Sequence, residues 1–156
     1  MGVSNSNYTT CLDTRKSVSG YLVFLNGAPV TIKSGMQKTT ALSVAEAEIF
    51  AAMQCTQDML YVMHVLNVMC LKVRKPLLLK MDNKGAIDLI NNYSVGGRMK
   101  HVDVRQYFLR ELCEQKTVKV IWVPSEMNCS DLFTKNLHRP MFEKHAVTFV
   151  SEKSVK

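Results

Sequence analysis

Apolar and polar residues alternate in the first third of the chain, in a pattern typical of β-strands. Residues 19–25, SGYLVFL, form an alternating apolar run, and Asn26-Gly27 after it is a strong signal for a tight hairpin turn. The next segment, APVTIKS at 28–34, predicts an antiparallel return strand. Residues 1–17 are polar and rich in turn-forming residues, so they predict at most a shortened first strand.

Near residue 43, the spacing of apolar residues changes from every second residue to the spacing of a helix. Apolar residues then recur at helical spacing to about residue 70, which predicts a long core helix with a bend between residues 55 and 57. Ser43, followed three residues later by Glu46, has the form of a capping box. The helix is therefore expected to begin at Ser43.

A strand passes directly into a helix within PLLLKMDNKGAIDLI, residues 76–90. Residues 77–81 form a short, mostly apolar run of strand length, and helical spacing resumes after Asp82 and Asn83. Either of these two residues can cap the helix. Because ligands collect at the carboxyl ends of strands in α/β sheets, Asp82 is also a candidate functional residue.

The second half of the chain continues to mix helices and strands. Predicted elements are a loop at 91–99, a helix at 100–115, a strand at 118–123, a helix at 129–137, and either a helix or an irregular tail at 140–147. The fold class is therefore mixed α/β. We expect one domain over residues 1–137, followed by a C-terminal helix or tail at 138–156.

Composition and charge narrow the class of protein further. The 156 residues carry a formal net charge of +7, which favours polyanionic partners such as nucleic acid. The five cysteines are odd in number and lack CxxC spacing, so we expect free thiols rather than disulfides or a zinc site. No apolar stretch is long enough to cross a membrane and no signal peptide is visible, so an intracellular protein without membrane partners is predicted.

Three carboxylates fall where a metal site could form, and each also has a simpler explanation. Asp82 ends a strand, but its role could be limited to capping the next helix. Glu48 lies among apolar helix residues, but its side chain could be exposed. Asp131 opens a late helix, where the helix dipole alone would stabilise it. Several carboxylates from different elements are what a pair of hard cations such as Mg²⁺ requires.

Long motifs in a fixed order identify a resemblance that covers almost the whole chain. The sequence resembles the ribonuclease H domain of copia-type LTR retrotransposon Pol polyproteins, through DTRKSVSGYLVFLNG (13–27), QKTTALSVAEAEIFAA (37–52), DNKGAIDLINN (82–92), GRMKHVDVRQYFLRE (97–111) and SDLFTKNL (130–137). The resemblance implies a ribonuclease H-like fold with a five-stranded mixed sheet. It also implies hydrolysis of the RNA strand of an RNA/DNA hybrid with two Mg²⁺ or Mn²⁺ ions.

The resemblance also assigns the metal ligands. Carried over motif by motif, the catalytic and metal-binding residues are Glu48, Asp82 and Asp131, and the fourth position falls on Asn5. The family has aspartate there and at the position of Asn7. Because an amide is a neutral and weaker ligand, weakened ion binding and impaired cleavage are expected. Natural decay of a transposon gene and deliberate replacement of two acids by amides explain the asparagines equally well.

The resemblance has further implications for partners. Arg98, Lys100, His101 and Lys135 are the candidate nucleic-acid-binding residues. A reverse transcriptase domain, fused or associated, is the expected protein partner, and the cytoplasm, the nucleus or a virus-like particle the expected location. Two rival hypotheses remain, a catalytically dead nucleic-acid-binding or structural remnant and, less favoured, a metal-independent protein-interaction module.

Overall fold

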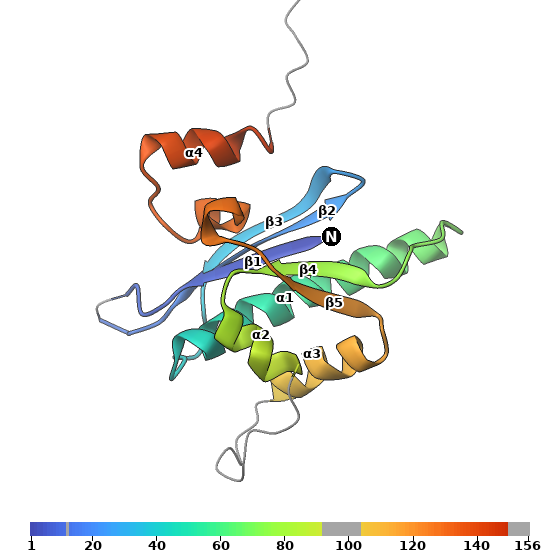
Figure 1. Ribbon diagram of the computed structural model, residues 1–156, viewed down its shortest axis with the longest axis horizontal. Coiled ribbons are helices and arrows are strands. Elements are labelled where there is room, and N and C mark those ends of the chain that lie inside the picture. The colour runs from blue at the N-terminus through green and yellow to red at the C-terminus, as the bar shows by residue number, and fades with distance from the viewer. Residues whose placement is uncertain (12, 92–103, 150–156) are drawn as a thin grey trace, which may run out of the picture.

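The computed structural model describes residues 1–11, 13–91 and 104–149, and its centre is a five-stranded mixed sheet. The strand order is β3-β2-β1-β4-β5, with β1 antiparallel to β2 and parallel to β4 (Figure 1). The strands are β1 (Gly2–Asn7), β2 (Val18–Leu25), β3 (Ala28–Met36), β4 (Leu77–Met81) and β5 (Val118–Trp122). The predicted fold class is confirmed. At six residues β1 is shorter than β2 and β3, yet all six residues pair with β2.

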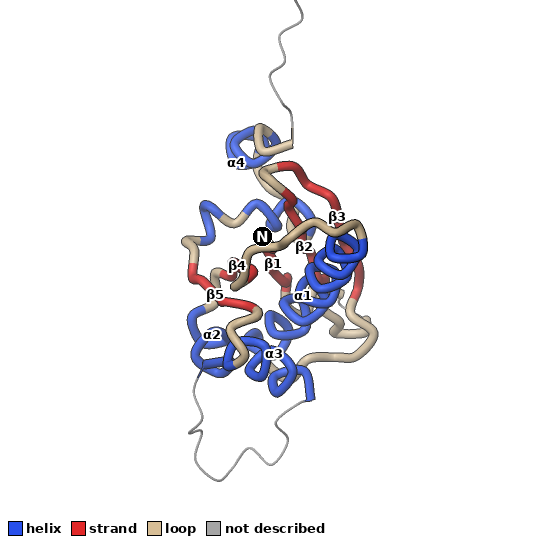
Figure 2. The backbone as a smooth tube through the Cα atoms, turned by 90° about the vertical axis from the view of Figure 1, so that its right-hand side faces the viewer, coloured by secondary structure: helices blue, strands red, loops and turns tan. Residues whose placement is uncertain are grey.

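Helices cover the two faces of this sheet unequally (Figures 1 and 2). On one face lie α1 (Val44–Val68), α2 (Lys84–Asn91) and α3 (Val104–Glu114), with α1 against β1 and β2. The opposite side carries two short 3₁₀ helices, η1 (Ser125–Met127) and η2 (Cys129–Phe133), and then α4 (Arg139–Ala146). Of these, η2 contacts β1 and β2 directly.

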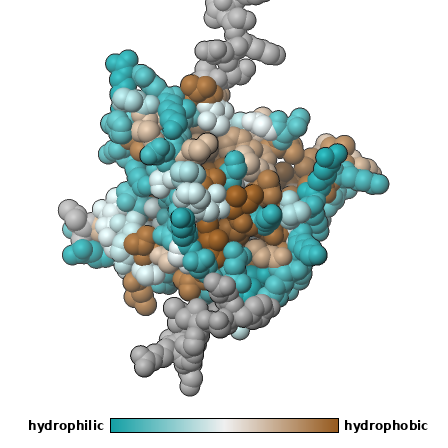
Figure 3. All heavy atoms as spheres, in the orientation of Figure 1, coloured by the Kyte–Doolittle hydropathy of each residue, from teal (hydrophilic) through white to brown (hydrophobic). Residues whose placement is uncertain are grey.

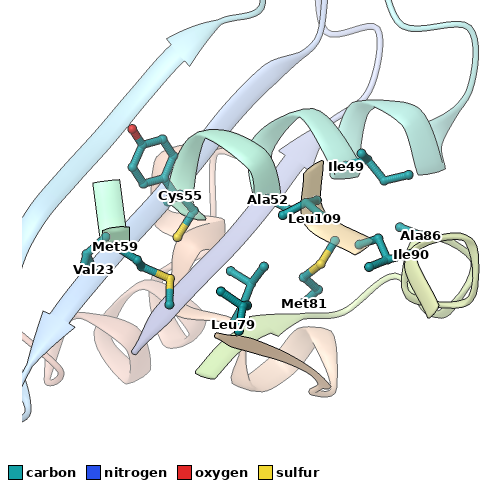
Figure 4. Close-up of a cluster of buried hydrophobic side chains, with 12 residues drawn as sticks. Val23, Ile49, Ala52, Cys55, Met59, Leu79, Met81, Ala86, Ile90 and Leu109 are labelled. Carbon is teal, nitrogen blue, oxygen red and sulfur yellow. The ribbon is translucent and has the colours of Figure 1, made fainter. Parts of the chain in front are cut away.

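Successive side chains of β2 point to opposite faces of the sheet, and both faces are covered because the side chains on each are apolar. Tyr21 and Val23 point into the large core beneath α1, where Figure 4 shows Val23 near Met59. Leu22 and Phe24, one residue out of phase, belong to a smaller cluster beneath η2. All four side chains are buried, so β2 is apolar on both faces.

Helix starts follow the predicted capping chemistry. The Ser43 side chain accepts a hydrogen bond from the Glu46 backbone N–H at 3.1 Å, and the Glu46 carboxylate accepts one from the Leu42 N–H at 2.7 Å. At α2, Asn83 Oδ1 accepts from the Ala86 N–H at 2.9 Å. Asn83 therefore caps α2, and the Asp82 carboxylate is left for another role.

Several predicted boundaries change. The helix predicted at 129–137 is wrong: only the 3₁₀ helix η2 forms, and Asn128 caps it by accepting from the Ser130 N–H. The long helix is continuous through residues 55–57. The chain beyond Pro140 forms α4 rather than an irregular tail. The predicted helix at 100–115 is seen as α3 from residue 104, since residues 100–103 lie outside the described part.

Surface and cysteine chemistry agree with an ordinary globular domain. All five cysteines are free thiols, as predicted. Within the described residues, no helix is both long and apolar enough to span a bilayer. Figure 3 shows apolar side chains near the middle of one face, interspersed with hydrophilic ones.

Candidate active site

The strand β1 sends neighbouring side chains to opposite faces of the sheet. Val3 packs in the cluster beneath η2, so Asn5, two residues on, faces η2 as well. Ser6 faces α1 instead, on the same side as Gly2, where an added Cβ would lie 2.6 Å from Cys55 Sγ of that helix. Adjacent residues of one buried strand therefore reach two different helical layers.

On the η2 side, Asn5 meets Asp131 and Lys135. The Asn5 side-chain amide donates a hydrogen bond to Asp131 Oδ1, and the Lys135 ammonium lies 3.1 Å and 3.2 Å from the two oxygens of the same carboxylate. Burial raises the pKa of Asp131, although the Lys135 ammonium acts in the opposite direction. We call Asn5, Asp131 and Lys135 the closed half of the site, because each oxygen of the Asp131 carboxylate has a donor.

On the α1 side, Glu48 meets Ser6. Glu48 Oε1 accepts from both the backbone N–H and the hydroxyl of Ser6, each at 3.1 Å. The residue is only 3% exposed, and its second oxygen, Oε2, is buried without a hydrogen-bond partner among the described residues. Burial raises the pKa of Glu48 to about 8, and the nearby charge of Asp82 adds to the shift.

Asp82 completes this second half at the carboxyl end of β4. The pairing of Gly2 with Leu79 and of Val3 with Lys80, continued along both strands, sets Asn5 beside Asp82. Asp82 Oδ2 accepts from the Ser125 hydroxyl at 2.7 Å, while Oδ1 is buried without a partner in the described chain. The charge of Asp82 raises the pKa of both Glu48 and Asp131, so the three carboxylates lie in one electrostatic cluster. We call Ser6, Glu48 and Asp82 the open half of the site.

Gly20 is a residue that sequence reasoning missed. It pairs with Asn5 across β1 and β2, and an added Cβ would lie 2.6 Å from Thr134 Cγ2 and 2.9 Å from Phe133 Cβ. The missing side chain lets η2 approach the sheet closely enough for Asp131 to reach Asn5. The available signal was a glycine inside an apolar strand, which often marks close approach of another segment.

Asn7 shows how the second asparagine is used. Its side-chain amide donates to the backbone carbonyl of Thr134 at 3.2 Å, just after η2. A carboxylate at this position could not donate that hydrogen bond. Both asparagines of β1 thus act as donors toward the η2 segment.

The residues proposed to contact nucleic acid are only partly described. Arg98, Lys100 and His101 lie outside the described residues, and the Lys135 ammonium is engaged by Asp131. Sequence reasoning missed Trp122, which ends β5, is 44% exposed and donates from its indole N–H to the Asp82 carbonyl at 3.0 Å. The Lys84 ammonium lies 4.5 Å from the centre of the Trp122 ring.

The oxygens present suit one hard cation better than two. Glu48 Oε2 and Asp82 Oδ1 are buried oxygens without hydrogen donors, which is the chemistry that Mg²⁺ or Mn²⁺ takes. Asp131, in contrast, is already occupied by Asn5 and Lys135. Within the described part of the chain, no group of three or more histidine, cysteine, aspartate or glutamate residues is arranged to hold a metal ion. The closed half therefore does not fit a cation in the arrangement observed.

Solved structures with the same architecture define the class of this protein. The N-terminal ribonuclease H domain of rv2228c from Mycobacterium tuberculosis superposes with a TM-score of 0.60 at 13% identity, covering 93% of this chain and 94% of that chain. LC11-RNase H1, solved in complex with an RNA/DNA hybrid, has a TM-score of 0.62 at 10% identity, covering 85% of this chain and 91% of that one. The chain has the ribonuclease H fold.

Sequence comparison gives the narrower relationship. No family model matches, but the chain is 33% identical over 142 residues to the retrovirus-related Pol polyprotein from transposon TNT 1-94 of Nicotiana tabacum. The match covers 91% of this chain and 11% of the polyprotein, so the chain spans about a tenth of the length of that relative. The resemblance to the ribonuclease H domain of copia-type retrotransposon Pol polyproteins is confirmed.

Proposed function

We propose that this ribonuclease H-like domain binds RNA/DNA hybrids and that its cleavage of the RNA strand is impaired by Asn5. The observation that carries the proposal is that Asn5 contacts Asp131 while Ser6, the next residue of β1, contacts Glu48, with Asp82 at the carboxyl end of the neighbouring strand β4. The four positions that the retrotransposon resemblance assigns to metal binding are Asn5, Glu48, Asp82 and Asp131. The catalytic role of the three acids is part of the proposal, with Glu48 and Asp82 as the residues that would hold a metal ion in the arrangement observed.

The identity of the substrate rests on fold and charge together. A hybrid-bound ribonuclease H has the same fold, and the net charge of +7 favours a phosphate backbone. Beside Asp82, the exposed Trp122 ring and Lys84 offer a stacking surface and a cation. Arg98, Lys100 and His101 remain proposed phosphate-binding residues, whereas the Lys135 ammonium is engaged by Asp131. A reverse transcriptase domain remains the proposed partner of the domain.

The proposed impairment follows from what an amide cannot do. A divalent ion in such a site would polarise the scissile phosphate and activate water. Asn5 supplies no negative charge, and its one oxygen, Oδ1, already accepts from the Ser6 N–H at 2.7 Å. Its nitrogen faces Asp131, so the amide contributes donor chemistry where the family has a carboxylate. The expected result is binding with little or no cleavage.

Binding is tested with a labelled hybrid and the intrinsic fluorescence of the protein. Trp122 is the only tryptophan in the sequence, so a change in its emission reports events beside Asp82. We expect the anisotropy of a labelled RNA/DNA hybrid to rise with protein, Trp122 emission to change in parallel, and affinity to fall steeply with salt. Lack of hybrid binding at low salt would refute the proposed function.

Cleavage is tested on the same hybrid with Mg²⁺ or Mn²⁺, comparing the chain with its Asn5→Asp variant. Because a misplacement of about 1 Å can cost on the order of a hundredfold in rate, we expect the variant to cleave at least about a hundred times faster. The Asn7→Asp variant is the matched control and should stay inactive, because Asn7 contacts a backbone carbonyl rather than Asp131. Robust cleavage by the unmodified chain would remove the assigned role of Asn5. An inactive Asn5→Asp variant that still binds hybrid would favour a catalytically dead remnant.

A further inference from the structure

We propose that this chain holds a single divalent cation, between the buried oxygens Oε2 of Glu48 and Oδ1 of Asp82, and that the Lys135 ammonium replaces a second cation at Asp131. The inference deepens the proposed function by stating how the altered site is balanced. It concerns the protein without nucleic acid, so it can be tested whether or not the chain binds a hybrid.

The closed half has an internal cation where a metal would otherwise be needed. Lys135 lies one helical turn after Asp131 in sequence and its ammonium contacts both carboxylate oxygens, at 3.1 Å and 3.2 Å. The Asn5 amide adds a further donor to Oδ1. A divalent ion at Asp131 would have to displace the ammonium and would meet the nitrogen of Asn5, which offers no lone pair for coordination.

The open half has the opposite character. Glu48 is 3% exposed, and its Oε2 atom is enclosed without a donor from the described residues. Asp82 Oδ1 is in the same condition. Burying unpaired carboxylate oxygens is costly unless a cation or a hydrogen bond compensates. Two such oxygens in one electrostatic cluster therefore point to a ligand that is a hard cation rather than an anion.

The formal charge of the whole site supports a count of one. With all three carboxylates ionised, as cation binding would require, and one ammonium, the site carries a charge of −2, since Asn5 is neutral. One divalent ion neutralises that charge. A second would leave a buried site with a charge of +2, which the low polarity of the surroundings opposes. Restoring the carboxylate at position 5 and removing the lysine would bring the charge to −4, which matches two divalent ions.

The test counts Mn²⁺ ions bound to the free protein by calorimetry and by electron paramagnetic resonance of unbound Mn²⁺. We expect one ion on the unmodified chain, one on Asn5→Asp, and two on the double variant Asn5→Asp/Lys135→Met. Lys135→Met alone should bind its single ion about tenfold more tightly, because a nearby positive charge has been removed. Asn5→Asp/Lys135→Arg keeps the positive charge and should bind one ion.

Two further variants serve as controls for the number of bound Mn²⁺ ions. Lys119→Met removes an exposed lysine of β5 and should leave the number of ions and the affinity unchanged. The double variant Asn5→Asp/Lys135→Gln repeats the key measurement if the methionine variant does not fold, as judged by circular dichroism. Two ions or none on the unmodified chain, two ions on Asn5→Asp alone, or one ion on both folded double variants would each overturn the proposal.

Discussion

The two halves of the candidate site differ in how fully their carboxylate oxygens are paired. In the closed half, the Asp131 carboxylate accepts from the Asn5 amide and the Lys135 ammonium. In the open half, Glu48 and Asp82 each keep one buried oxygen without a donor among the described residues. The comparison teaches that replacing one carboxylate by an amide affects the halves unequally: the closed half gains a donor, and the open half retains the features of a metal site.

This difference should be visible in stability as well as in metal binding. A paired buried carboxylate stabilises the fold only modestly, because desolvation offsets its attraction to the partner. An unpaired one destabilises the fold whenever it is ionised. The variants below separate the two halves on this basis, beginning with the largest expected effect.

The largest effect is expected in the open half, from Glu48→Gln in metal-free buffer. The pKa of Glu48 is raised to about 8 in the folded protein, so its contribution to stability is full below its unfolded value of 4.5 and is lost as the pH rises through about 8. Relative to the variant, the unmodified chain should therefore lose up to about 5 kcal/mol of unfolding free energy between acidic and alkaline pH. Urea denaturation at a series of pH values, with a chelator present, measures this difference.

Glu111→Gln is the matched control for that experiment. Glu111 lies exposed on α3 and accepts a hydrogen bond from the Gln115 side chain, so the same change there should leave the pH profile almost unaltered. Parallel pH profiles for the unmodified chain and Glu48→Gln would show that Glu48 titrates normally and that the open half is not strained.

A smaller loss is expected in the closed half, from Gly20→Val. The new side chain would collide with Thr134 and Phe133 and push η2 away from Asn5. We expect destabilisation of about 3 kcal/mol, within the range for overpacking a buried contact. Gly35→Val is the control, because a Cβ at Gly35 of β3 meets no atom within 4 Å. Equal stability of the two variants would refute the close approach of η2.

The smallest effect should come from Lys135→Met, which removes the ion pair of the closed half. The Lys135 side chain is 36% exposed while that of Asp131 is 8% exposed, so solvent screening limits the loss to about 1 kcal/mol near neutral pH. The loss should shrink in acid, where Asp131 becomes protonated. Thermal unfolding at neutral and acidic pH measures it, and a loss that is independent of pH would argue against the Lys135–Asp131 ion pair.

Local sequence patterns predicted most of the fold because they report short-range physics. The capping box at Ser43, the Asn26-Gly27 turn and the apolar run before Asp82 each act within a few residues, and the structure contains all three elements. The prediction at 129–137 failed because Leu132 and Phe133 satisfy a helical pattern, whereas Asn128 and the contact of η2 with the sheet select a tighter turn.

The site was predictable as a set of acids but not as a set of contacts. Motif resemblance selected Glu48, Asp82 and Asp131, and the charge of Asp82 contributes to the raised pKa of both other acids, after burial. The sequence could not show that Ser6 donates a hydrogen bond to Glu48, since that contact depends on which face of β1 is turned toward α1. Lys135 lies four residues after Asp131, a spacing that favours an ion pair and is visible in the sequence. The resemblance instead assigned Lys135 to phosphate binding.

The positions of these contacts along the chain also set an order for folding. Ser6 and Glu48 are 42 residues apart, whereas Asn5 and Asp131 are 126 residues apart. Closing the longer loop costs about 1 kcal/mol more in chain entropy, and it requires nearly the whole domain to have been synthesised. The contact of Glu48 with β1 can thus form within the β1–β2–β3 meander and α1 while the ribosome is still making β4. The bond between Asn5 and Asp131 joins the two ends of the domain, and we expect it to form late and to act mainly by slowing unfolding.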